Sequence, residues 1–370
     1  MKIKILGHYT TKVGELWDKG LEDLLHEAIE GSLKNSDVNP DKIEAVYVAN
    51  KASGQLNSQL HLNALASEYF EHYPPAMRVE GACASGGLAM IAAEQALLAG
   101  HYQTVLVVGV EKMTDISVAQ TTEALSLAAD QIRENGSTFP ALYALLAEAH
   151  MKKYGTTREQ LSATAVKNHA FAVNNPLAQY RKEISIELVN ESAVIASPLR
   201  LFDCSPISDG ASAVVLTSKE VKNKPEIAGF GHAQDSLDLA GRKSLTSLAA
   251  TIKAGKQAYS RAGVQPGDIQ AAEVHDCFTI AEILAIEDLG WFKKGEGGKA
   301  TLEGETGKDG KIIINSSGGL KAFGHPIGAT GVKQIAFLAN KLEKGVFNLV
   351  LAHNLGGSGA TAVVHILKNS

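Results

Sequence analysis

Three short runs of this 370-residue chain carry the residue types that covalent acyl transfer uses. The first is Gly-Ala-Cys-Ala-Ser-Gly-Gly at 81–87, which lies between an apolar, strand-like approach and a helical stretch at 88–98. A thiol beside the first turn of a helix meets the positive end of the helix dipole and free backbone N–H groups. Both favour the nucleophilic thiolate. We therefore expect Cys83 to be a nucleophile, and a buried structural cysteine is the plain alternative.

The other two runs supply a second thiol and two imidazoles. Residues 275–278 read His-Asp-Cys-Phe directly after an apolar segment, and residues 324–326 read Gly-His-Pro inside a glycine-rich one. Active sites of open α/β sheets gather outside the carboxyl ends of the strands. A nucleophile, a second thiol and two histidines match a covalent acyl-transfer site. The residues that we expect to meet there are Cys83, His275, Cys277 and His325.

Composition excludes several other classes of protein. The chain is 45% hydrophobic and 20% charged with a formal net charge of −5, which is typical of a soluble globular protein and argues against nucleic-acid binding. Three cysteines are too few, and odd in number, for a disulfide framework, so a reducing compartment is expected. Cys204 lies in a turn-like Asp-Cys-Ser-Pro run, and we interpret it as structural.

The ends of the sequence point to no membrane or export signal. The first residues lack the apolar core and cleavage site of a signal peptide, and no stretch is apolar for long enough to span a bilayer. The last four residues match no familiar address signal. A cytoplasmic enzyme is therefore expected.

The chain also repeats itself loosely. In each half, a short strand is followed by a glycine-flanked run that carries a candidate catalytic residue. A helix that stops at a glycine, a second strand and a closing β-rich run come next. In the first half the two strands are 43–49 and 104–110, the helix is 88–98 and the closing run is 211–217; in the second half they are 269–274 and 347–352, 331–342, and 361–367. This order predicts a duplicated α/β unit with largely parallel sheets and a site at the seam.

A long insertion interrupts the first repeat. We expect one core half at 1–114 plus 201–218, an inserted domain at 115–200, and a second core half at 219–370. The insertion holds helical patterns at 144–154 and 158–173, the latter with a capping box of Thr157 and Gln160. A lid or ligand-binding segment and a surface decoration are equally open interpretations.

With these residues in view, the sequence resembles thiolases, and most closely the sterol carrier protein-type and archaeal acetoacetyl-CoA branch. Six segments in order carry the resemblance: 81–87, 109–115, 203–216, 275–278, 318–331 and 353–359. The resemblance implies an α/β thiolase fold, in which duplicated βαβ core domains form a layered α-β-α-β-α arrangement with an inserted helical loop domain.

The resemblance also implies a role for each candidate residue. Cys83 matches the family nucleophile, and His325 the histidine that activates it. Most thiolases carry a second cysteine in a Cys-x-Gly motif where this chain has Asn354, which has no useful pKa. They also carry Asn-Glu-Ala-Phe where this chain has His-Asp-Cys-Phe, so Cys277 takes the acid/base role.

The same resemblance implies two oxyanion holes. His275 and His325 would hold the enolate oxygen, and the backbone N–H groups of Cys83 and Gly356 would hold the tetrahedral intermediate. The segment 244–248 resembles the family's loop that contacts coenzyme A, with Ser247 and Leu248 the expected contacts. A polar helix start is an equal interpretation of that segment.

The implied activity is reversible, non-decarboxylating Claisen condensation and thiolysis of acyl-CoA substrates, without a metal or redox cofactor. At least a homodimer or homotetramer is expected, and a pathway partner protein is open. Two other functions also stay open at this point. A decarboxylating ketoacyl synthase would fit one cysteine and two histidines but needs no thiol base. A non-catalytic scaffold of the same fold would leave Cys83 inert.

Overall fold

The computed structural model describes residues 2–369, and its centre is one mixed sheet of ten strands. The strands are β1 (Ile3–Thr10), β2 (Ala45–Ala49), β3 (Ala76–Val79), β4 (Thr104–Glu111), β7 (Gly210–Thr217), β8 (Glu226–Gln234), β9 (Ala271–Glu273), β10 (Ile313–Ile314), β11 (Leu349–Gly356) and β12 (Thr361–Lys368). A separate hairpin pairs β5 (Val194–Ala196) with β6 (Leu199–Arg200). Among the described residues no helix combines the length and apolar character that crossing a membrane requires.

The strand order reveals two copies of one unit. The sheet runs β10-β9-β11-β12-β8-β1-β7-β4-β2-β3, so each half has the same arrangement read outward from the seam. The halves meet where β1 pairs with β8 through only two residue pairs, Ile3 with Ile227 and Lys4 with Glu226. The predicted duplication is thus confirmed, although the sequence interpretation missed β1 and β8, the two strands at the seam.

The prediction of largely parallel sheets is wrong. In the first half β2 pairs in parallel with β3 and β4, but β7 is antiparallel to both β4 and β1. The second half repeats this, with β9 parallel to β10 and β11, and β12 antiparallel to β11 and β8. The closing strand of each half needs no crossover helix because it runs back against its neighbour.

The helices that pack directly on the sheet form three layers around its two halves. In chain order the helices are α1 (Leu21–Ser36), α2 (Ser53–Leu56), α3 (Leu62–Ser67), α4 (Ser85–Leu98), α5 (Val118–Ser126), α6 (Phe139–Tyr154), α7 (Arg158–Ala172), α8 (Ile186–Glu191), α9 (Ala249–Ala262), α10 (Thr279–Asp288), α11 (Gly297–Leu302), α12 (Gly319–Phe323) and α13 (Thr330–Glu343). Three short 3₁₀ turns lie at Pro40–Lys42, Leu201–Asp203 and Pro266–Asp268.

The middle layer consists of α4 and α13, which touch both half-sheets and each other. Their apolar residues join those of both sheets in one buried cluster. The two helices approach most closely at their first turns, where a Cβ on Gly86 would lie 2.7 Å from the Gly331 nitrogen. With α1 and α3 outside one half-sheet and α9 outside the other, the predicted α-β-α-β-α layering is confirmed.

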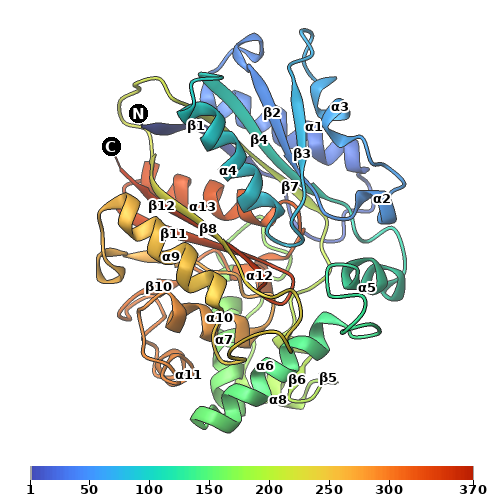
Figure 1. The fold of residues 1–370 in the computed structure, drawn as a ribbon, viewed down its shortest axis with the longest axis vertical. Helices are drawn as coiled ribbons and strands as arrows, with labels where there is room; N and C mark the ends of the chain where they lie inside the picture. The colour runs from blue at the N-terminus through green and yellow to red at the C-terminus, as the bar shows by residue number, and fades with distance from the viewer. Residues whose placement is uncertain (1, 370) are drawn as a thin grey trace.

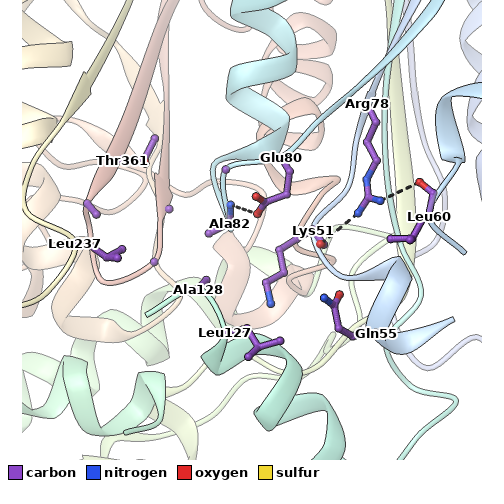
Figure 2. Close-up of a pocket in the computed structure, with 14 residues that line it drawn as sticks. Lys51, Gln55, Leu60, Arg78, Glu80, Ala82, Leu127, Ala128, Leu237 and Thr361 are labelled. Carbon is purple, nitrogen blue, oxygen red and sulfur yellow. Dashed lines mark hydrogen bonds between the residues drawn. The ribbon is translucent and has the colours of Figure 1, made fainter. Parts of the chain in front are cut away.

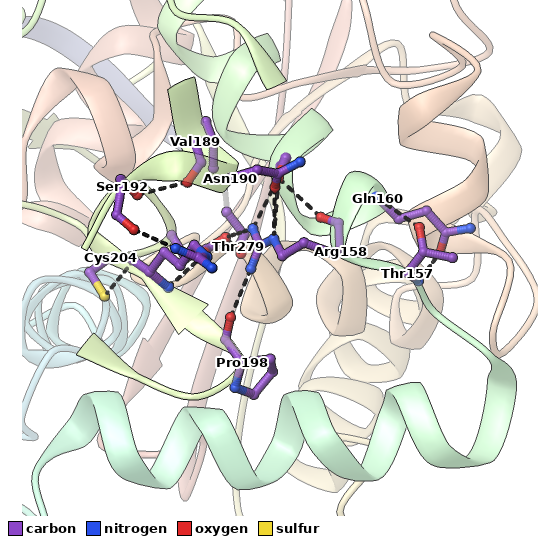
Figure 3. Close-up of polar contacts among 12 residues, drawn as sticks. Thr157, Arg158, Gln160, Val189, Asn190, Ser192, Pro198, Cys204 and Thr279 are labelled. Atoms are coloured by element: carbon purple, nitrogen blue, oxygen red, sulfur yellow. Dashed lines mark hydrogen bonds and ion pairs between the residues drawn. The ribbon is translucent and has the colours of Figure 1, made fainter. Parts of the chain in front are cut away.

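The insertion packs against the second half rather than standing apart (Figure 1). The predicted capping box of Thr157 and Gln160 begins α7, which contacts α10, α11 and α12. Arg158 donates to Asp203 at 2.5 Å, and Asp203 also accepts from Thr279 at 2.7 Å (Figure 3). The insertion is therefore tied to the start of α10, two residues beyond Cys277. The three domain boundaries themselves stay a prediction.

Candidate active site

Cys83 lies in a tight turn between β3 and α4, two residues before the helix begins. Ala82 adopts a left-handed conformation with φ of 53°, which costs a non-glycine residue about 1 kcal/mol. Ser85 holds this turn, because its hydroxyl donates to the Ala82 carbonyl at 2.6 Å and accepts from Gly81 N–H at 3.0 Å. The turn therefore presents the thiol at a fixed place in front of the helix.

The two predicted histidines meet the predicted nucleophile. The sulfur of Cys83 and one ring nitrogen each of His275 and His325 lie within 4.8 Å of one another. The two imidazole rings are nearly perpendicular, with centroids 5.1 Å apart. The Nε2 atom of each ring is buried and has no hydrogen-bond partner among the described residues, so both are free to meet a substrate.

His325 is held as a neutral base. Its Nδ1 atom lies 2.7 Å from the Thr330 hydroxyl, which donates its own proton to the Pro326 carbonyl at 3.0 Å. The Thr330 oxygen must therefore accept from His325, so Nδ1 carries the proton and Nε2 keeps a lone pair. Burial and the positive charge of Lys333 lower the pKa of His325 to about 3, which keeps the ring neutral at working pH.

The surroundings of Cys83 favour the protonated thiol over the thiolate. Burial raises the pKa of the Cys83 thiol to about 11, and the charge of Lys51 and the backbone N–H of Gly357 only partly oppose this. Loss of water around the sulfur thus outweighs the groups that favour the anion. The thiol must give up its proton during attack, and the lone pair of His325 is in place to take it.

Lys51 is a residue that the sequence interpretation missed. Its ammonium donates to the carbonyls of Ala124 and Leu125 at the end of α5. It lies in the wall of two neighbouring cavities, and after burial its charge is the largest influence on the Cys83 pKa. Its run Ala-Asn-Lys-Ala contains no motif, so only the folded chain reveals it.

Lys51→Met should slow the reaction of Cys83 with iodoacetamide about tenfold at neutral pH, because losing the nearby cation raises the thiol pKa further. The measurement is the alkylation rate against pH, followed by intact mass. Lys51→Arg keeps the charge and should react at nearly the wild-type rate. Equal rates for the methionine variant and the wild type would contradict the assigned influence of Lys51.

Cys277 lies between β9 and α10 and faces the same cavity as Cys83. Burial and the neighbouring Cys83 raise its pKa well above the usual thiol range, whereas a hydrogen bond with Tyr143 acts in the opposite direction. The Tyr143 hydroxyl donates its proton to the Gly357 carbonyl at 3.1 Å, and its ring stacks on Phe278 at 4.5 Å. Tyr143 thus links the insertion to the second thiol.

Two cavities meet at Lys51. The inner one has a volume of about 250 Å³ and a largely apolar wall that includes Met113, Phe139 and all three cysteines of the chain. The outer one, of about 610 Å³, is lined by polar groups that include Arg78, Glu80 and Thr361 (Figure 2). Because α5 and α6 supply much of the inner wall, the ligand-binding interpretation of the insertion is favoured over decoration.

Gly356, the last residue of β11, lies against the nucleophile turn. A Cβ at this position would come within 2.6 Å of the Gly81 carbonyl oxygen, so only glycine fits. The backbone N–H groups that approach the Cys83 sulfur are those of Gly357, one residue later, and of Cys83 itself. The share of Gly356 in an oxyanion hole stays a prediction, and Gly357 is an addition to the site.

The two expected contacts to coenzyme A lie outside both cavities. The Ser247 hydroxyl donates to Asp288 at 2.8 Å, and the Leu248 N–H donates to the same carboxylate at 2.7 Å. The Leu248 side chain is fully buried, and a Cβ on Gly359 would lie 2.7 Å from it. This arrangement positions the turn after β11, and contact of Ser247 or Leu248 with coenzyme A stays a prediction.

Comparison with known proteins agrees with this fold and site. The family model described as "Thiolase, N-terminal domain" matches residues 3–220, and that described as "Thiolase C-terminal domain-like" matches residues 231–369. The chain is 44% identical to an acetyl-CoA acetyltransferase of Methanothermobacter thermautotrophicus, over 99% of each chain. It is 32% identical to sterol carrier protein 2 of Bos taurus, over 78% of this chain and 58% of that protein.

A solved structure described as "Ltp2-ChsH2(DUF35) aldolase" has the same fold, with a TM-score of 0.83 at 22% identity over 100% of this chain and 98% of the other. The chain belongs to the thiolase family, and it is an acyltransferase. The resemblance to the archaeal and sterol carrier protein branch is confirmed by these relatives.

Proposed function

We propose that the protein condenses two molecules of acetyl-CoA to acetoacetyl-CoA and coenzyme A, and catalyses the reverse thiolysis. The observation that best supports this reaction is the second thiol, Cys277, which lines the cavity of Cys83 together with His325. The name of the 44% identical archaeal relative supports acetyl-CoA as the substrate. Thioester enolate chemistry needs only a base and hydrogen-bond donors, so we propose that neither a metal nor a redox cofactor takes part.

The first half-reaction loads the enzyme. The Cys83 sulfur attacks the carbonyl carbon of acetyl-CoA while its proton passes to the Nε2 lone pair of His325. The C–S bond to coenzyme A then breaks, and His325 passes this proton to the leaving thiolate. The enzyme is left with acetyl-Cys83, a neutral His325 and the Cys277 thiol. Backbone N–H donors around Cys83 stabilise the oxyanion, and removing one such donor typically costs about 3–4 kcal/mol.

The second half-reaction forms the carbon–carbon bond. The Cys277 sulfur removes an α-proton from a second acetyl-CoA while its own proton passes to Nε2 of His325, and the enolate oxygen is held by the Nε2–H groups of His275 and His325. The enolate carbon attacks the acetyl carbonyl, the bond to the Cys83 sulfur breaks, and His325 returns its proton to that sulfur. Each residue recovers its starting protonation state, so the cycle balances.

Both alternative functions are less well supported. A decarboxylating synthase would make its carbanion by losing carbon dioxide, which gives Cys277 no task. A scaffold without activity would not need the unpartnered nitrogens of His275 and His325 to converge on a thiol.

We also propose that the protein works in the cytoplasm as a homodimer or homotetramer. The neighbouring solved structure names two proteins, Ltp2 and ChsH2, in one description, and this supports a search for a partner protein of the present chain. Light scattering on the purified protein measures the mass of the assembly. A mass equal to that of one chain would contradict the proposed self-association.

The proposed reaction is tested by incubation with acetyl-CoA alone and intact-mass measurement. One acetyl group should be added to the wild type and none to Cys83→Ala, because only this thiol has the adjoining base. Malonyl-CoA should release no carbon dioxide. An unmodified wild type, or release of carbon dioxide, would contradict the proposed reaction.

A further inference from the structure

The side-chain amide of Asn354, on β11, has a defined orientation. Its Oδ1 accepts from the N–H of Gly87 at 3.1 Å, and its Nδ2 donates to the carbonyl of Cys83 at 2.9 Å. A backbone donor and a backbone acceptor on opposite sides of the amide allow only one of its two flips. The NH₂ group therefore faces away from Gly87 and toward the catalytic residues.

This orientation determines where His275 carries its proton. The Nδ2 of Asn354 lies 3.2 Å from Nδ1 of His275. An amide NH₂ group can only donate, so Nδ1 must hold the lone pair and Nε2 the proton. The Nε2 atom is buried without a partner among the described residues, and one ring nitrogen of His275 belongs to the cluster with Cys83 and His325. His275 thus has the tautomer opposite to that of His325.

We propose that Asn354 is a positioning residue that fixes His275 as an Nε2–H hydrogen-bond donor, so that the two neighbouring histidines perform different tasks. His325 presents a lone pair that takes the Cys83 proton. His275 presents an N–H that holds the thioester oxygen when it becomes an enolate. This inference rests on the proposed function for its catalytic consequence, but the tautomer itself does not depend on turnover.

The packing explains how Asn354 reaches this place. Its Oδ1 atom lies at the close contact of α4 and α13, where a Cβ on Gly331 would be 2.5 Å away and one on Gly87 would be 3.2 Å away. These glycines leave the space that the amide fills between the two helix starts. With asparagine instead of cysteine at position 354, the role of this residue is therefore to orient His275 and not to transfer a proton.

The tautomer has a second consequence. A thiol and two imidazoles are ligand types that bind Zn²⁺, but a metal needs a lone pair on each donor atom. With Asn354 donating to Nδ1, the Nε2 atom of His275 holds a proton and cannot bind a metal in that state. The amide thus disfavours capture of a soft cation by the catalytic residues.

The test is imidazole NMR with ¹⁵N-labelled histidine, on the wild type and on Asn354→Asp. The wild-type His275 should show a protonated Nε2 and an unprotonated Nδ1. The aspartate can only accept, so in the variant the proton should move to Nδ1. A wild type with its proton on Nδ1, or a variant that keeps it on Nε2, would overturn the proposal. The wild-type spectrum decides the matter even where the variant does not fold.

A kinetic split provides the second readout. Exchange of the acetyl-CoA α-protons with deuterated solvent should fall about 10²-fold or more in Asn354→Asp, as for loss of an oxyanion donor. Acetylation of Cys83 should fall much less, because it uses backbone donors. The double variant His275→Asn, Asn354→Asp should exchange α-protons almost as fast as His275→Asn alone, because the asparagine amide at 275 has no tautomer for residue 354 to fix.

Equal losses of exchange and acetylation in Asn354→Asp would assign Asn354 a merely structural role. So would a double variant whose loss of exchange equals the two single losses combined.

Discussion

Cys277→Ala should still form acetyl-Cys83 but lose about 10²–10⁴-fold in acetoacetyl-CoA synthesis, the usual contribution of general acid–base catalysis. Without the second thiol the cavity lacks the group assigned to remove the α-proton, whereas His325 can still activate Cys83 and return a proton to the leaving coenzyme A. The measurement pairs intact mass for the acetyl adduct with a coupled assay of condensation.

The matched control for this variant is Cys204→Ala. It removes the third thiol from the wall of the same cavity, where burial raises the thiol pKa to about 12. Condensation should stay within a few-fold of wild type. Condensation that survives in Cys277→Ala would remove Cys277 from the acid/base role, and an equal loss in the Cys204 variant would point to cavity shape instead of proton transfer.

The largest loss is expected for His325→Ala, because one residue supplies both the base for Cys83 and a donor to the enolate. Acetylation of Cys83 at neutral pH should fall by at least about 10³-fold, measured by rapid quench and intact mass.

The wild-type pH profile adds a direct check on His325. Its pKa of about 3 lies below the usual histidine value, so the base form is fully present above that pH and is lost only as the pH falls through it. The rate of Cys83 acetylation should therefore show no fall due to histidine protonation between pH 5 and 8. A fall in this rate with a midpoint near pH 6.5 that is absent in His325→Ala would contradict a buried neutral base. Thr330→Val, which removes the Nδ1 partner and the bond to the Pro326 carbonyl but leaves the imidazole in place, should cause a smaller loss.

The parts of the site that are predictable from the sequence are those with a local signature. Cys83 and His325 stand in glycine-rich runs at the starts of helices, and Cys277 follows an apolar strand. Lys51 and Tyr143 have no such signature, since their influence depends on which segments the fold brings together. The same holds for the pKa of Cys83, because the helix start is visible in the sequence but the desolvation of the sulfur is not.

The fold shows the same division. The repeated order of elements predicts the duplication and its layers, because each half buries its own apolar strands around a glycine-stopped helix. It does not predict the antiparallel closing strands, since the mainly apolar closing run at 211–217 does not reveal which way the strand runs. The strands at the seam, β1 and β8, carry no catalytic motif and are recognisable only from their pairing.

The hydrogen bond between Asn354 and the Cys83 carbonyl joins residues 271 apart in sequence. This separation determines how long after Cys83 the ribosome adds its partner Asn354. At 5–20 residues per second the ribosome needs roughly 14–54 s to travel from one to the other. For most of that interval the apolar surface of α4 has neither α13 nor the second half-sheet against it, and Cys83 has no base because His325 has not yet been made. The emerging chain therefore cannot carry out acyl transfer, and the apolar face of α4 stays exposed until the second half of the chain packs on it.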